Sequence, residues 1–155
     1  PAQHGSGIVH GDYRLGNMAF APDDPGRVVA VFDWEMATLG DPLADLGYTL
    51  IYWKDPGDPD YTRLPLFTDQ PGFPRRAEIA EEYAKRSGRD VAHVDFYQVL
   101  ALTKLAVISE GIYARHLQGK TLGAGFEKMR RESEPLARRA LELADAAPDA
   151  RLRGA

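Results

Sequence analysis

Cysteine is absent from all 155 residues, which excludes disulfide bonds and thiol chemistry from this chain. A basic excess is also lacking: Lys and Arg number 19 against 23 Asp and Glu, and the formal net charge of -4 gives no broad positive field for nucleic acid. No apolar run approaches the roughly 18 residues of a membrane span, and no basic segment followed by an apolar core marks a secretory signal. These features predict a cytoplasmic protein that binds neither membrane nor nucleic acid.

The composition is otherwise that of a globular domain, with 44% hydrophobic and 27% charged residues. Asp41 is expected to cap a helix that starts at Pro42, a residue preset for a first helical turn. A hairpin is expected around a turn at 23–26, with strands at 18–20 and 28–32. Apolar periodicity and capping residues predict the helices 42–53, 75–87, 91–118 and 125–147. The sequence therefore predicts one mostly helical α+β domain.

The residues that carry chemistry gather between Ile8 and Gly47. Asp12 follows a short apolar strand, and Asn17 comes five residues after it. Asp33 ends the second strand of the predicted hairpin, and Glu35 follows two residues later. A hairpin places the loop before its first strand beside the loop after its second strand. We therefore expect Asp12, Asn17 and Asp33 to converge on one site.

Phosphoryl transfer from ATP needs such a set. It requires a carboxylate that orients the attacking hydroxyl and accepts its proton, and hard oxygen ligands for Mg²⁺. The pattern predicts Asp12 as the catalytic base and Asn17 and Asp33 as Mg²⁺ ligands. Glu35 is a candidate outer ligand, which would reach the ion directly or through water.

Two further residues of the same loop are candidate catalytic residues. His10 is expected to orient the loop rather than to transfer protons. Arg14 has two interpretations: it neutralises charge on the transferred phosphoryl group, or it forms a surface ion pair.

The spacing His10-Gly11-Asp12 to Asn17 has the Asp-to-Asn offset of the protein-kinase catalytic loop, with Gly in place of Arg. This variant resembles the aminoglycoside phosphotransferase family of kinase-like small-molecule phosphotransferases. The segments 32–35 and 40–47 strengthen the likeness. It looks closest to the subgroup fused to acyl-CoA dehydrogenases, whose later segments resemble 96–97 and 110–112 of this chain. The specific motifs cover residues 8–47.

The resemblance implies that residues 1–155 form the C-terminal catalytic and substrate lobe of a protein-kinase-like fold, with the nucleotide-clamping N-terminal lobe outside them. It implies ATP and Mg²⁺ as cofactors. Asp45 would hold the catalytic-loop backbone, although an ordinary solvent-facing aspartate is the alternative. The acceptor would be a hydroxyl of an aminoglycoside, amino alcohol, sugar or hydroxyacyl compound. We expect this chain alone to be inactive and to self-associate through its apolar cleft face.

Two other functions are alternatives to a phosphotransferase. A catalytically inactive kinase-like binding module would be expected to lose one of Asp12, Asn17 and Asp33, and all three are present. A metal-dependent hydrolase would need a further ligand cluster, which His4, His93 and His116 do not form by their spacing.

The segment 54–74 is rich in proline and carries four aspartates: Asp55, Asp58, Asp60 and Asp69. These aspartates have two interpretations: they cap turns, or they attract a cationic substrate.

Overall fold

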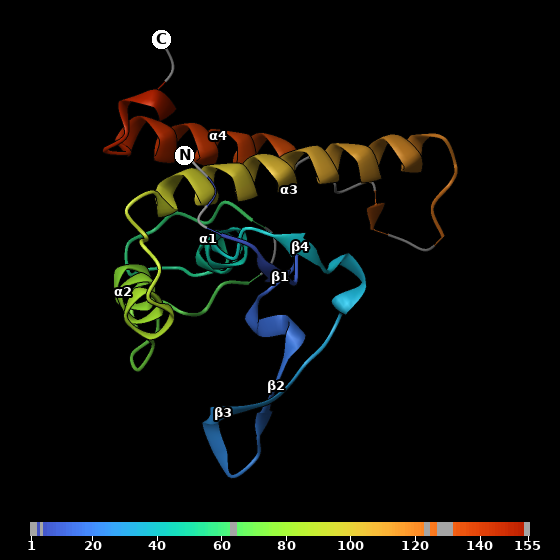
Figure 1. The fold of residues 1–155 in the computed structure, drawn as a ribbon. Coiled ribbons are helices and arrows are strands. Elements are labelled where there is room, and N and C mark those ends of the chain that lie inside the picture. Colours follow the sequence, from blue (N-terminus) through green and yellow to red (C-terminus); the bar gives the residue numbers. More distant parts are fainter. Residues whose placement is uncertain (1–2, 4, 63–64, 123–124, 127–131, 154–155) are drawn as a thin grey trace.

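The computed structural model describes residues 3, 5–62, 65–122, 125–126 and 132–153. The described helices are α1 (Leu43–Ile51), α2 (Arg76–Ser87), α3 (Val94–Leu117) and α4 (Ser133–Ala146). The strands are β1 (Gly7–Val9), β2 (Met18–Ala21), β3 (Asp24–Val31) and β4 (Thr38–Gly40). Short 3-10 turns are η1 (Leu15–Asn17), η2 (Trp34–Met36) and η4 (Ala150–Leu152). Helices α3 and α4 lie side by side, α1 lies against α3, and the β2–β3 hairpin projects away from the helices (Figure 1).

The strands form two antiparallel pairs, β1 with β4 and β2 with β3. The predicted hairpin is confirmed, but its turn at 23–26 is wrong. Ala21 pairs with Asp24, which leaves a two-residue turn between them. Pro25 and Gly26 lie instead in β3, where the pairing register shifts, and such a bulge tolerates a residue without an amide hydrogen. Strand β4 was not predicted, because three residues are too few to show an alternating pattern.

Helix α1 is buried on two faces. It starts after Asp41, whose Oδ1 accepts a hydrogen bond from Leu43 N at 3.0 Å, the contact expected of a cap. Tyr48 and Ile51 pack against α3 and α4. An apolar stripe along α1 and the two residues after it packs largely toward α2 and the start of α3; its buried members are Leu43, Leu46, Leu50 and Trp53.

Only part of the surface of helix α3 is buried in the core. Ala101, Leu102 and Ala106 are buried against α4. Leu100 and Val107, in contrast, are 48% and 67% exposed. Because the helix is apolar almost all round, its sequence does not distinguish the face that packs from the face that does not. No helix among the described residues is both long and apolar enough to cross a membrane.

The final helix was predicted over 125–147, and α4 begins only at Ser133. The predicted helical residues 127–131 lie outside the described part of the chain.

The acidic segment 54–74 is tied to α2 and α4 by arginines. Asp58 Oδ2 accepts from Arg76 Nη2 at 2.6 Å, and Asp58 Oδ1 lies 3.5 Å from Arg139 Nη2. Asp55 Oδ2 accepts from Arg76 Nε at 3.1 Å. Asp58 also caps a turn, because it accepts from Asp55 N at 2.9 Å. Lys54 Nζ lies 2.7 and 3.7 Å from the other two carboxylates, those of Asp60 and Asp69. All four carboxylates are thus paired with cations of the chain itself.

The contact of α1 with α3 depends on Gly47. A Cβ built at this position would lie 2.6 Å from the backbone carbon and from Cβ of Tyr97 in α3. The two helices therefore approach this closely because residue 47 has no side chain. The Tyr97 hydroxyl fixes the same crossing by donating to Asp41 Oδ2 at 2.7 Å.

We expect Gly47→Ala to lower the free energy of unfolding by about 1–3 kcal/mol, the usual cost of an overpacked core. Gly111 is a matched control on α3, because a Cβ there would meet nothing within 4 Å. Gly111→Ala should raise the free energy of unfolding by about 0.5–1 kcal/mol, the gain of replacing a glycine inside a helix. Urea denaturation followed by circular dichroism measures both, and changes of the same sign would contradict this packing.

Candidate functional site

The loop between β1 and β2 lies against the segment between β3 and β4. Phe32 N donates to Asn17 O at 2.8 Å, which continues the β2–β3 pairing to the end of the loop. His10 Nε2 and Phe32 O lie 2.7 Å apart across the same boundary. The two segments that carry Asp12 and Asp33 are therefore neighbours, as the hairpin predicted.

His10 is buried, with 2% of its surface exposed. Asp12 N donates to His10 Nδ1 at 3.2 Å, so Nδ1 is the acceptor and Nε2 carries the hydrogen that Phe32 O accepts. The Trp34 ring packs on the imidazole with the ring centroids 4.7 Å apart. Both ring nitrogens are engaged, so this arrangement suits a residue that orients the loop.

Asp12 is in direct contact with two of the predicted site residues. Asn17 Nδ2 donates to Asp12 Oδ2 at 2.7 Å and to the Asp12 carbonyl oxygen at 2.8 Å. Arg14 Nε lies 3.2 Å from both carboxylate oxygens of Asp12. The side chains of Arg14 and Asp12 are 28% and 16% exposed, so the pair is only partly screened by water. Of the two interpretations of Arg14, an ion pair is present, and its partner is the predicted base.

Asp33 has the left-handed backbone conformation, with φ 66° and ψ 50°, and among the described residues it is the only non-glycine with positive φ. This conformation costs an L-residue about 1–2 kcal/mol, and aspartate is one of the few that adopt it. Strain of this kind gathers at functional sites. Asp33 and Glu35 are both exposed, and neither side chain forms a hydrogen bond or ion pair with the part of the chain that the structure describes.

The donor set fits Mg²⁺. The amide nitrogen of Asn17 is engaged by Asp12, which leaves its carbonyl oxygen for a metal, and the carboxylate of Asp33 is exposed. Mg²⁺ keeps several waters and takes few protein ligands beside phosphate oxygens. Within the described residues, no group of three or more His, Cys, Asp or Glu could hold a metal ion by itself. The oxygens of Asn17 and Asp33 are therefore candidate ligands for Mg²⁺.

Asp45 of α1 reaches the loop backbone. Its Oδ2 accepts from His10 N at 2.6 Å, and its Oδ1 accepts from Gly11 N at 2.9 Å. These are the contacts of a carboxylate that holds the loop. Asp41, four residues earlier, acts on the fold instead, through the helix cap and the Tyr97 hydroxyl.

Three residues near the loop were not predicted to belong to the site. Thr49 Oγ1 donates to the carbonyl oxygen of Tyr13 at 2.8 Å, and Lys104 Nζ donates to that of Gly11 at 3.0 Å. Tyr48 is buried beside them, and burial, with smaller effects of Tyr52 and Asp12, raises the pKa of its hydroxyl. The sequence could have drawn attention to Lys104, because it is a cation within an otherwise apolar stretch of helix. Nothing in the sequence marks Thr49 or Tyr48 as site residues, since both residue types are ordinary in helices.

A pocket opens beside Arg14. Its volume is about 810 Å³, and one side of it is formed by Arg14, Thr49 and Tyr52. Most of the remaining wall is aromatic and apolar and comes from the hairpin, the end of α1 and the segment 54–74: Phe20, Trp53, Leu66, Phe67 and Phe73. The size suits a small molecule.

These features, an Asp held by an Asn five residues away and a neighbouring exposed Asp, fit the class of kinase-like phosphotransferases. A sequence profile described as the phosphotransferase enzyme family matches residues 1–97, more than half of the chain. The chain belongs to this family.

A solved structure from Ralstonia eutropha JMP134, provisionally described as an aminoglycoside phosphotransferase, has the same fold, with a TM-score of 0.78 and 35% sequence identity. The match covers 93% of this chain and 44% of that chain. It confirms the predicted kinase-like fold.

Curated relatives extend the comparison. Acyl-CoA dehydrogenase family member 11 of Rattus norvegicus is 34% identical over 139 residues, and family member 10 of Mus musculus is 33% identical over 149. The alignments cover 88% and 93% of this chain but 18% and 14% of those proteins. The chain thus spans less than a fifth of their length. The predicted likeness to phosphotransferases linked to acyl-CoA dehydrogenases is confirmed.

We expect Asp45→Ala to lower the free energy of unfolding by about 1–3 kcal/mol, because the amides of His10 and Gly11 would lose their acceptor. Asp145→Ala is the control, since Asp145 is an exposed residue of α4. It should change stability by no more than about 0.5 kcal/mol. Chemical denaturation measures both. Equal, small effects would show that the contacts to the loop contribute nothing.

Proposed function

We propose that this chain carries the catalytic and acceptor-binding part of an ATP-dependent phosphotransferase that phosphorylates a hydroxyl of a small molecule. The observation that carries the proposal is the hydrogen bond of Asp12 with Asn17 beside the exposed, strained Asp33. Membership of the phosphotransferase family supports the reaction class. The use of ATP and Mg²⁺ and the hydroxyl acceptor are part of the proposal.

In this proposal Asn17 Oδ1 and the Asp33 carboxylate would hold Mg²⁺, with Glu35 as an outer ligand. When bound, ATP would supply the phosphoryl group, and Mg²⁺ would neutralise the charge of the phosphates. Asp12 orients the acceptor hydroxyl and receives its proton, while Asn17 Nδ2 fixes the Oδ2 end of that carboxylate at 2.7 Å. Arg14 already lies against Asp12, and we assign it to the neutralisation of charge on the transferred group.

We further propose that a second, nucleotide-clamping lobe covers the surface around β1, β4 and η2. A surface in contact with water is usually polar, but this one is apolar. Ile8 and Leu39, which are paired across β1 and β4, are 72% and 76% exposed. Phe32, Trp34 and Met36 extend it, at 56%, 50% and 44% exposure. Exposed patches of this kind mark interaction surfaces. The Ralstonia chain, of which the matched region is 44%, has the length for such a lobe. Self-association of the chain through the same surface is the competing proposal.

The pocket beside Arg14 is our candidate acceptor site. Its wall is largely aromatic and apolar, and the aspartates of the adjoining segment are paired with Arg76, Arg139 and Lys54. A polycation would find no unpaired carboxylate among these four. We therefore propose an acceptor with an apolar body rather than an aminoglycoside, and acceptor screens should include both kinds.

Asp12→Asn tests the base. The protein for this test is the complete natural polypeptide that contains residues 1–155, assayed with Mg·ATP and the screened acceptors. Turnover should fall by about 10²–10⁴-fold, because the acceptor hydroxyl loses its proton acceptor. ATP affinity should stay nearly unchanged.

The matched control for Asp12 is Asp23→Asn, at an exposed residue that pairs with Arg27 on the hairpin. Its turnover should equal that of the wild type. Full turnover in Asp12→Asn would remove Asp12 from the reaction. If the wild-type protein binds Mg·ATP but turns over none of the screened acceptors, that result would favour a catalytically inactive binding module.

Asp33→Gly tests the metal site and the strain together. Loss of the carboxylate should weaken Mg·ATP binding by at least about tenfold, while binding of ATP in EDTA stays the same. The free energy of unfolding should not fall, because glycine adopts positive φ without the cost that aspartate bears. Calorimetry and urea denaturation give the two quantities. A fall in stability with no selective loss of Mg·ATP would identify Asp33 as structural.

A further inference from the structure

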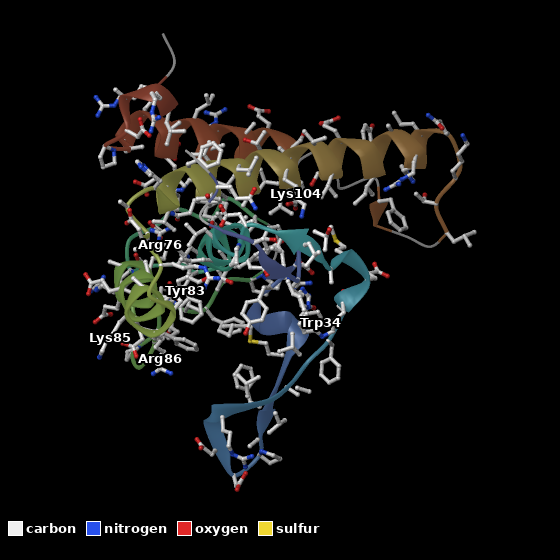
Figure 2. All side chains as sticks on the ribbon, viewed as in Figure 1. Trp34, Arg76, Tyr83, Lys85, Arg86 and Lys104 are labelled. Carbon is white, nitrogen blue, oxygen red and sulfur yellow. The ribbon has the colours of Figure 1, made fainter. Side chains whose placement is uncertain are left out.

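Lys104 lies at the centre of α3, on the side that faces α1 and the β1–β4 pair (Figure 2). Its Nζ donates to the carbonyl oxygen of Gly11 at 3.0 Å and lies 5.1 Å from the centroid of the Tyr48 ring. An ammonium over a tyrosine face is attracted by the ring quadrupole. Tyr48 itself is 6% exposed. The cation is thus held between a buried aromatic ring and the loop of the predicted base.

The bond to Gly11 acts on one particular peptide unit. The carbonyl of Gly11 and the amide of Asp12 belong to the same planar group. The amide end donates to His10 Nδ1 at 3.2 Å, and the carbonyl end accepts from Lys104. The next peptide is held by Asn17, whose Nδ2 donates to the Asp12 carbonyl at 2.8 Å. The Cα of Asp12 is therefore fixed from both sides.

This peptide needs an external hold because Gly11 has a φ of +88°. A Cβ at Gly11 would meet the carbonyl oxygen of Met36 at 3.0 Å, so a side chain that would limit rotation is excluded here. Glycine populates both signs of φ about equally, so the peptide that follows it turns easily. The bond that the Asp12 amide donates to His10 Nδ1 is long, at 3.2 Å. A hydrogen bond from an ammonium is about twice as strong as one between neutral groups.

We infer that Lys104 is a positioning residue that locks the Gly11–Asp12 peptide and so fixes the direction of the Asp12 carboxylate. Its effect on catalysis rests on the proposed function, whereas its effect on the loop does not. No group of Lys104 touches the reacting atoms in this inference.

The first experiment measures how firmly the Gly11–Asp12 peptide is held. Lys104→Met removes the ammonium and keeps the aliphatic stem, and Lys120→Met makes the same change at an exposed lysine beyond α3. Amide exchange followed by NMR should show the Asp12 amide exchanging at least about tenfold faster in Lys104→Met, with the Leu102 amide unchanged. Lys120→Met should match the wild type. An unchanged Asp12 amide, or an equal loss of protection at Leu102, would overturn the inference.

The second experiment restores the cation. The chain has no cysteine, so Lys104→Cys introduces a thiol that is unique within residues 1–155. Alkylation with 2-bromoethylamine joins the cysteine sulfur to an aminoethyl group with loss of bromide, which rebuilds an ammonium at nearly the length of lysine. The alkylated protein should regain the slow exchange of Asp12, and Lys104→Arg should regain part of it. Failure of both would show that packing, rather than the donor, holds the loop.

Turnover then separates the inference from the proposed function. In the complete polypeptide with Mg·ATP and the screened hydroxyl acceptors, the release of ADP that accompanies phosphorylation of the acceptor should fall by about 10–100-fold in Lys104→Met, with the KM for ATP within about twofold. Alkylated Lys104→Cys should recover it, and Lys120→Met should not change it. Normal kcat in Lys104→Met would overturn the inference. If the wild type releases no ADP, the proposed function fails, and amide exchange alone decides the role of Lys104.

Discussion

The structure of the site depends on one constraint: residues 10–14, around Asp12, lie in no helix or strand, so side chains from elsewhere satisfy their backbone groups. Asp45 accepts from two of its amides, and Thr49 and Lys104 donate to two of its carbonyls. Buried backbone groups without partners cost free energy comparable to a lost hydrogen bond. The loop is therefore only as ordered as helices α1 and α3 that supply these side chains.

Helix α1 supplies two of them from one face. Asp45 and Thr49 are four residues apart, which places them one above the other on the helix. The remaining faces of α1 are buried in the two apolar clusters, so the helix cannot turn without loss of packing. Gly47 and Tyr97 then set the approach of α3, and Lys104 lies seven residues, about two turns, beyond Tyr97 on the same side. The crossing of two helices thereby determines where the ammonium meets the loop.

The side chains of the candidate site are held in different ways around this loop. Asn17 and His10 hold Asp12 from within the loop, and Asp33 is offered to solvent by a backbone conformation that costs free energy. Arg14 lies between Asp12 and the pocket walled by the segment 54–74. That segment keeps its shape through Asp55, Asp58 and Arg76, so its acidic residues serve the fold rather than a cationic ligand. The pocket that we propose for the acceptor is therefore shaped mainly by apolar walls.

The sequence alone was enough to predict the family, the fold class and the candidate site residues. The Asp12-to-Asn17 spacing, the hairpin and Asp33 are local patterns, and local patterns are readable because their residues are fixed relative to one another by the chain. The sequence also predicted that Asp41 caps the start of α1. The tertiary structure alone decided that β4 pairs with β1, that one face of α3 stays exposed, and that Lys104 reaches Gly11, 93 residues away. Such contacts join residues far apart in the chain, and their distance is set by how helices pack rather than by any spacing along the sequence.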